Sequence, residues 1–376
     1  MPANKDQHFV PKHYLRQFQI PGKEKQICAA RIEPLKLIVP CGIEGQCQED
    51  YFYREDGNLD DLLRESEKDL APILLRVSEF GIFDRKDLTA LQMLAVILHI
   101  RTRKNIEHQK LLPRRIADEV IRNAIATGEL PPPEGGWKPE MMDFSGVAGG
   151  IMKASAIPCW LEMRTLECKV LRAYSGSFFI TSDHPVVMLN QLFSAKDNFR
   201  SFVGFSRSGF QLLLPISPQF ALFFYDPKIY KVGSRRERIV EISIDDVSIA
   251  NSLQVQNAER CIYFHVPGLA PQIEELILKY SGLRKKSENH LREYPLSDDR
   301  HTLLHLKTPS VILPRTWTFC RYRRHRTVGI NNRRNPAWTN LIDRLMRDMD
   351  ENPSGGDIFD RLEKILGAKI KNYVAD

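Results

Sequence analysis

The sequence lacks the short motifs that identify several large classes of enzyme. It has no GxxxxGK[ST] phosphate loop, no GxGxxG after a predicted strand and no GxSxG nucleophile elbow. The first two motifs place backbone amides around phosphate groups, and the third exposes an activated serine. Their absence argues against a nucleotide-driven motor and against a Rossmann oxidoreductase.

The sequence also lacks an apolar run of membrane-spanning length and an N-terminal secretion signal. The longest apolar stretch, residues 91–100, is interrupted by Gln92 and His99. It has about half the length that a membrane-spanning helix needs. The first residues contain no apolar core and no cleavage-site pattern. We therefore expect a cytoplasmic protein that has no membrane partner.

Regularly spaced cysteines are missing as well. The seven cysteines have irregular spacing and no CxxC occurs, so neither a disulfide framework nor a zinc ribbon is expected. The 376 residues are 43% hydrophobic, which is enough apolar material for one large or two ordinary domains. The net charge of +7 is compatible with nucleic acid as a partner but does not require it.

The period of the apolar residues changes along the chain. Residues 58–80, 84–107 and 113–127 have the spacing of helices. Later segments have short β-type runs between Gly and Ser turns. Helices followed by strands favour an α+β fold with a helical N-terminal half, an antiparallel or mixed β-rich middle and a helical basic C-terminal tail. The predicted strands are 169–173, 178–181, 211–215, 220–225 and 261–266, with a helix at 245–258.

These patterns divide the chain into two parts. Residues 1–310 are expected to form one α+β domain, helical over 1–165 and β-rich over 166–310. Residues 311–376 are expected to be a basic C-terminal extension with amphipathic helices at 338–349 and 358–365.

Four motifs follow one another over residues 8–265. They are His8-x-x-Pro11-x-x-Tyr14-Leu15-x-x-Phe18, Glu67 with Arg101-Thr102 on the next helix, residues 180–186 (ITSDHPV), and Asn251 to Asn257-Ala258 followed by Ile262-Tyr263. Their order resembles that of the bacterial family known as domain of unknown function 4238, and the resemblance covers about two-thirds of the chain. Members of that family resemble accessory and defence-associated proteins of mobile elements, which implies a role in anti-phage defence.

Four polar residues of these motifs form the candidate catalytic set: His8, Glu67, Arg101 and Asp183. A histidine transfers protons near neutral pH, and a carboxylate orients it or acts as the base. An arginine holds a phosphate and offsets developing charge. Such a set is suited to phosphodiester cleavage without a metal, and it requires no cofactor.

Each of the four residues also has a structural interpretation. Residues 8–18 are equally typical of a docking segment, in which His8 satisfies a buried partner. Asp183 precedes His184-Pro185 and suits an Asx turn. Glu67 and Arg101 lie on neighbouring predicted helices, where a buried ion pair is expected. Convergence of the four residues in one solvent-reachable cleft would separate the two interpretations.

A metal site is the alternative chemistry. His8, His13 and the adjacent Asp183 and His184 offer ligands, and residues 8–11 are similar to the start of a His-Asn-His nuclease motif. The second half of that motif is not evident, and no DxD or ExK cluster occurs. We therefore assign no metal ligands, and a divalent metal stays open as an alternative.

The basic tail interleaves cations with aromatic residues. Arginine forks suit phosphates and aromatic faces suit unstacked bases. The alternation of Trp317, Phe319, Arg321 and Arg323 equally suits an edge strand whose charges block aggregation. The expected nucleic-acid contacts are Trp317, Arg321, Tyr322, Arg323, Arg324, Arg326, Arg333 and Arg334.

These observations favour a nuclease, with RNA as the preferred partner and a toxic effector role in bacterial anti-phage defence. The alternative is a non-enzymatic module that binds nucleic acid or protein, including a second copy of the chain. In that case the motif residues hold the fold.

Overall fold

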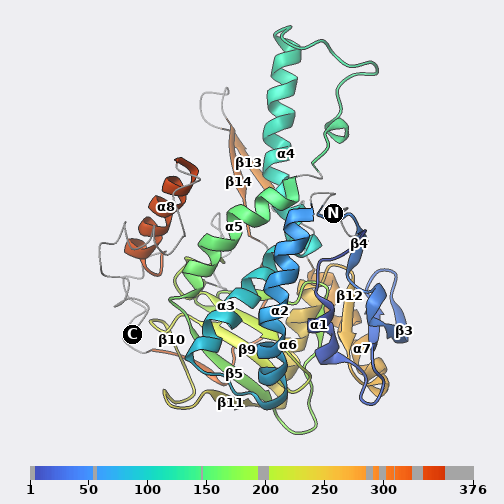
Figure 1. Cartoon of the computed structure of the whole chain (residues 1–376), viewed down its shortest axis with the longest axis vertical. Coiled ribbons are helices and arrows are strands. Elements are labelled where there is room, and N and C mark those ends of the chain that lie inside the picture. The colour runs from blue at the N-terminus through green and yellow to red at the C-terminus, as the bar shows by residue number, and fades with distance from the viewer. Residues whose placement is uncertain are drawn as a thin grey trace.

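The computed structural model of the chain describes residues 5–53, 57–144, 147–193, 203–284, 291–295, 302–308, 310–323 and 333–351. The protein is a mixed α+β fold with helices and several sheets, as the sequence predicts. Figure 1 shows helices packed over a central sheet and a smaller sheet to one side. It also shows α4 (Arg103–Ala126) extending away from the body beside the antiparallel pair of β13 (Leu291–Pro295) and β14 (Thr302–Leu306).

The largest sheet has five strands in the order β11-β5-β9-β8-β7. The sheet is mixed, because β11 runs parallel to β5 and the other neighbours are antiparallel. Three of its strands lie where short apolar runs predict them. The bounds are β5 (Glu167–Ala173), β7 (Val187–Leu189), β8 (Gln211–Pro215), β9 (Phe220–Tyr225) and β11 (Ile239–Ile242).

Both faces of this sheet are buried, and alternate residues of each strand enter different cores. On β9, Leu222 and Phe224 face the core that contains α2, α3 and α5, whereas Phe223 faces the core that contains α6. None of the helices that the structure describes is long and apolar enough to cross a membrane. The bounds are α2 (Gly57–Phe80), α3 (Arg85–Ile100), α5 (Val147–Met163) and α6 (Ile244–Asn257).

The smaller sheet has the order β3-β2-β12-β6, and α7 (Ala270–Tyr280) packs against it. Its strands are β3 (Lys36–Gly42), β2 (Gln26–Arg31), β12 (Cys261–Phe264) and β6 (Thr181–Ser182). The strand predicted over 178–181 forms only at its last residue. The Asn251 side chain of α6 donates to Phe178 O (2.8 Å) and accepts from Ile180 N (3.0 Å), so a side chain replaces a neighbouring strand there.

The helix predicted over 84–107 is in fact two helices, α3 and α4 (Arg103–Ala126). The helix expected to begin at Pro113 is the second half of α4, and Pro113 lies inside it. A capping box between Asp84 and Asp87 starts α3. The chain leaves the helix at Thr102, whose backbone is extended (φ −69°, ψ 147°). No glycine or proline marks this break, so helical periodicity could not reveal it.

The tail after residue 310 buries side chains in the same two cores as the rest of the chain. Trp317 is 4% exposed and packs against Phe223, with ring centroids 6.3 Å apart. β15 (Cys320–Tyr322) pairs with β10 (Tyr230–Val232). Helix α8 (Pro336–Glu351) lies where residues 338–349 were expected to be helical. The helix expected over 358–365 lies outside the described residues.

Candidate functional site

Arg101, at the end of α3, is the centre of the predicted catalytic set. Its side chain is 3% exposed, and all three guanidinium nitrogens donate to protein groups. Nη1 donates to Glu67 Oε1 (2.5 Å), Nη2 to the backbone oxygen of His8 (2.5 Å) and Nε to the Tyr53 hydroxyl (3.2 Å). The guanidinium therefore serves as a structural fork that ties α2 and β1 (Asp6–His8) to α3.

Glu67 completes this arrangement from α2. Its Oε2 lies 3.5 Å from His13 Nδ1. Burial alone would raise the pKa of Glu67, but the hydrogen bond from His13 and the charge and hydrogen bond of Arg101 outweigh it and lower the pKa to about 2. The structure thus contains the interhelix ion pair that was the structural alternative for these two residues.

His8 meets Arg101 through its backbone oxygen, not through its ring. The imidazole Nε2 instead lies 3.2 Å from Glu44 O. Burial lowers the pKa of His8, and the positive charges of Lys12 and Arg101 act in the same direction. His8 and Arg101 are therefore neighbours, but their side chains do not form a joint site for a proton transfer.

Asp183 holds a turn. Its carboxylate accepts three backbone hydrogen bonds, from Glu259 N (2.8 Å), Arg260 N (2.7 Å) and Cys261 N (3.1 Å). Burial raises the pKa of Asp183 despite these donors. Among the described residues, no hydrogen bond or ion pair joins Asp183 to His8, Glu67 or Arg101. The predicted set is split between two places.

The connection between these places is the α3–α4 junction, residues 101–104. Four consecutive side chains each bind a different segment of the chain. The contacts are Arg101 with Glu67 and His8 O, Thr102 with His184, Arg103 with Glu49 and Glu259, and Lys104 with Asn257 O. The motifs of the sequence thus meet at one junction and determine how α4 enters the fold.

A small cavity lies beside this junction and has a volume of about 130 Å³. Its walls include three histidines, a lysine and two asparagines: His99, Lys104, Asn105, His108, His184 and Asn257. We call it the histidine–lysine cavity. The rings of His99 and His184 are 5.7 Å apart. His99 Nδ1 is buried and has no hydrogen-bond partner within the part of the chain that the structure describes.

Burial controls the protonation of this cavity. It lowers the pKa of Lys104 to about 8 and that of His99 to about 4, the latter with help from the charge of His108. Burial and the charge of Lys104 hold the pKa of His184 well below its usual range. At neutral pH the cavity therefore contains a charged ammonium beside neutral imidazoles.

The tautomer of His184 follows from its neighbour. The Thr102 hydroxyl donates its single proton to His99 O (3.1 Å). The same hydroxyl oxygen lies 2.5 Å from His184 Nδ1, and when the hydroxyl donates to His99 O it accepts from Nδ1. In that tautomer the lone pair of the neutral imidazole is on Nε2, which can accept a hydrogen bond.

The residues that form this cavity were not in the predicted set. His99 stood out only as an interruption of an apolar run, and His184 only as the neighbour of Asp183 in the alternative metal site. A polar residue inside a buried helical pattern, next to the motif pair Arg101-Thr102, was the available signal. Among the described residues, no group of three or more His, Cys, Asp or Glu side chains is placed to hold a metal ion.

The basic tail has a mixed placement. Arg321, Tyr322 and Arg323 are exposed, and so is Arg333. Trp317 and Arg334 are buried, 4% and 5% exposed, so neither presents its side chain to a nucleic acid. Arg324 and Arg326 lie outside the described residues.

The comparisons with known proteins identify the family that the sequence resembles. The family described as protein of unknown function (DUF4238) matches residues 6–267, which include the α3–α4 junction and most of the cavity wall. Neither the curated proteins nor the solved structures gave a match. The chain belongs to the DUF4238 family.

Proposed function

We propose that this chain is a phosphodiester-cleaving enzyme, a ribonuclease, and that its chemistry takes place in the histidine–lysine cavity. One observation carries the proposal. Lys104 and three histidines line a single cavity in which His99 Nδ1 has no partner among the described residues. Buried polar groups are normally paired, so an unpaired one suggests a missing ligand.

The protonation states suit this reaction at neutral pH. His184 Nε2 would accept the proton of the ribose 2′-hydroxyl as its oxygen bonds to phosphorus. Lys104, with a pKa of about 8, would give a proton to the departing 5′-oxygen as the old P–O bond breaks. A hydrogen bond from His99 would hold a phosphate oxygen, whereas the single proton of neutral His108 is donated from Nε2 to Lys307 O (3.0 Å). No further reactant is needed to form the cyclic phosphate.

Two further features support RNA as the substrate. The exposed side chains of Arg321, Arg323 and Arg333 offer cations to a phosphate backbone, and Tyr322 offers a ring. The role as a toxic effector in anti-phage defence rests on the family resemblance alone. In this proposal His8, Glu67, Arg101 and Asp183 are positioning residues, because they fix the junction that carries Lys104.

The test is incubation of the purified chain with end-labelled RNA and DNA, with and without EDTA. We expect RNA cleavage that persists in EDTA and declines above pH 8, as Lys104 loses its proton. His184→Asn and Lys104→Met should each reduce the rate about 100-fold or more. His305→Asn, in β14 (Thr302–Leu306), is the matched control and should retain full activity. Absence of cleavage in every condition, or undiminished cleavage by Lys104→Met, would overturn the proposal.

The second candidate function is a binding module without catalysis. The observation that favours it is that Glu67, Arg101 and Asp183 are all bound to protein groups. It predicts that wild-type protein binds RNA or a protein partner and leaves it intact. Intact RNA recovered from a complex that resists competitor would favour the module over the enzyme.

A further inference from the structure

The histidine–lysine cavity is closed on one side by the loop of residues 203–210. Gly204 and Phe205 of this loop line the cavity. The rings of Phe205 and His99 are 5.7 Å apart. The cavity volume of about 130 Å³ is below the roughly 300 Å³ of the smallest usual ligand pockets. The cavity would therefore have to widen to admit a nucleotide, and movement of this loop would widen it.

The loop is fastened to the C-terminal segment. Arg334 N donates to Ser206 O (2.8 Å), and Arg207 and Arg333 form an isolated antiparallel bridge. Lys228 Nζ also donates to Arg334 O (3.5 Å). These contacts join residues that are more than a hundred positions apart in the sequence. One partner of each contact, Arg333 or Arg334, lies outside residues 6–267, which the family model matches.

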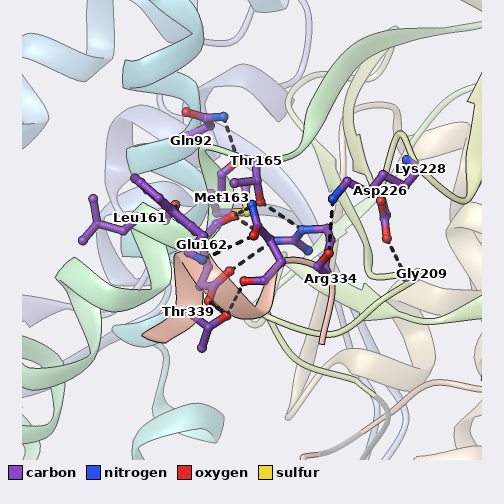
Figure 2. Close-up of polar contacts among 12 residues, drawn as sticks. Gln92, Leu161, Glu162, Met163, Thr165, Gly209, Asp226, Lys228, Arg334 and Thr339 are labelled. Atoms are coloured by element: carbon purple, nitrogen blue, oxygen red, sulfur yellow. Dashed lines mark hydrogen bonds and ion pairs between the residues drawn. The ribbon is translucent and has the colours of Figure 1, made fainter. Parts of the chain in front are cut away.

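The side chain of Arg334 reaches past the loop to the end of α5 (Figure 2). Nε donates to Thr165 Oγ1 (2.9 Å), and Nη2 donates to Glu162 O (2.8 Å) and lies 3.4 Å from Glu162 Oε2. Thr339, in α8, donates to the other oxygen of the Glu162 carboxylate (2.7 Å). Because α5 also contributes Cys159 to the cavity wall, Arg334 connects two walls of the cavity.

This connection is buried but incompletely satisfied. The side chains of Arg334 and Glu162 are 1% and 7% exposed. Arg334 Nη1 is buried and makes no hydrogen bond to any described residue. Burial raises the pKa of Glu162 and lowers that of Arg334, so it disfavours the charged form of both. A buried pair with an unmet donor adds little net stability, although its geometry is specific.

We propose that residues 333–351 form a latch that holds the loop of residues 203–210 over the histidine–lysine cavity. Release of Arg334 from Glu162 frees the loop and opens the cavity to a ligand. The C-terminal segment thereby slows entry to the cavity in the wild-type chain without abolishing it. The latch is independent of the chemistry in the cavity, whereas its biological meaning rests on the proposed function.

The test measures access to the cavity in the full-length protein, without an activity assay. Cys159 lines the cavity and is half-buried, and burial raises the pKa of its thiol to about 12, so a maleimide modifies it slowly. Peptide mass spectrometry gives its labelling rate relative to that of Cys41, a half-buried thiol in β3. Trypsin cleavage after Arg207 reports on the loop itself.

Arg334→Met should increase both the relative labelling of Cys159 and cleavage after Arg207 about fivefold or more. Thr339→Val removes one hydrogen bond to Glu162 and should give a smaller increase in both. Arg344→Met changes an exposed arginine of α8 and is the matched control that should match wild type. Unchanged rates in Arg334→Met and Thr339→Val would overturn the latch.

Three other outcomes are decisive. Equal acceleration at the fully buried Cys28 would mean that the fold loosens as a whole, and it would also overturn the latch. Selective acceleration at Cys159 together with intact RNA in every variant would leave the latch standing and remove the ribonuclease. Cleavage of RNA together with unchanged labelling in every variant would support the ribonuclease and overturn the latch.

Discussion

Two polar sites lie at the α3–α4 junction, and they differ in how their hydrogen bonds are satisfied. At Arg101 every guanidinium nitrogen has a protein acceptor, and Glu67 accepts from both sides. In the histidine–lysine cavity, His99 Nδ1 has none among the described residues, and the pKa of Lys104 is lowered by burial. At the first site the charges are balanced by the fold, although His13 Nε2 also has no hydrogen-bond partner among the described residues. At the second site the unpartnered nitrogen of His99 lines a cavity.

The difference teaches that motif residues need not be catalytic residues. A satisfied buried network stabilises one arrangement of the chain, because removal of either partner leaves the other without compensation. An unsatisfied buried group destabilises the free protein, and it gains a hydrogen bond when a ligand binds beside it. Variants at the two sites should therefore change stability in opposite directions.

The largest expected effect belongs to Arg101→Met. It leaves the Glu67 carboxylate and the His8 carbonyl without their buried donor, and it should lower the free energy of unfolding by about 3 kcal/mol or more. Urea titration followed by circular dichroism measures it. Arg76→Met is the matched control, because Arg76 is 49% exposed where it pairs with Asp87, and its loss should change stability by less than about 1 kcal/mol. Equal losses of stability in both variants would contradict the structural role assigned to Arg101.

A smaller effect should appear in the pH dependence of Glu67→Gln. The pKa of Glu67 in the folded protein is about 2, below the unfolded value of 4.5. Its contribution to stability is therefore complete above pH 4.5 and is lost as the pH falls toward 2, by about 2 kcal/mol after allowance for partial exposure. Thermal unfolding from pH 6 to pH 2.5 should show a gap between wild type and variant that closes with acid. A constant gap would contradict this.

The smallest change in stability is expected for Lys104→Met. Because burial lowers the pKa of Lys104 to about 8, its charge weakens the fold at pH 7, and the loss of its bond to Asn257 O offsets part of any gain. The free energy of unfolding should stay the same or rise by about 1 kcal/mol. Inorganic phosphate should raise the melting temperature of wild type but not of this variant. A loss above about 2 kcal/mol would show a structural role instead.

Much of the fold could be predicted from the sequence, because the buried face of a helix or strand requires apolar residues at the spacing of that element. Short apolar runs located β8 and β9, and the pattern over 58–80 located α2. The break at Thr102 could not be predicted, because it depends on contacts of residues 101–104 with distant segments. Likewise Pro113 suggested a helix start, but it lies within α4, where packing overrides local preference.

The candidate site could be predicted only in part, for a related reason. The sequence singled out Arg101 and Asp183 but left two interpretations open, and their hydrogen bonds now show what each side chain touches. His99, Lys104 and His184 come from three different elements and have no common spacing. Their convergence is a property of the tertiary structure, which no local pattern encodes.

The α3–α4 junction fixes the rotation of α4 about its own axis. Each α-helical residue turns the helix by about 100°. One residue inserted after Ile100 would therefore rotate Arg101, Thr102, Arg103 and Lys104 away from all their partners at once. Substitutions there remove contacts singly, whereas a change in length removes them together. The spacing between α3 and α4, more than the identity of any one side chain, sets the position of the cavity.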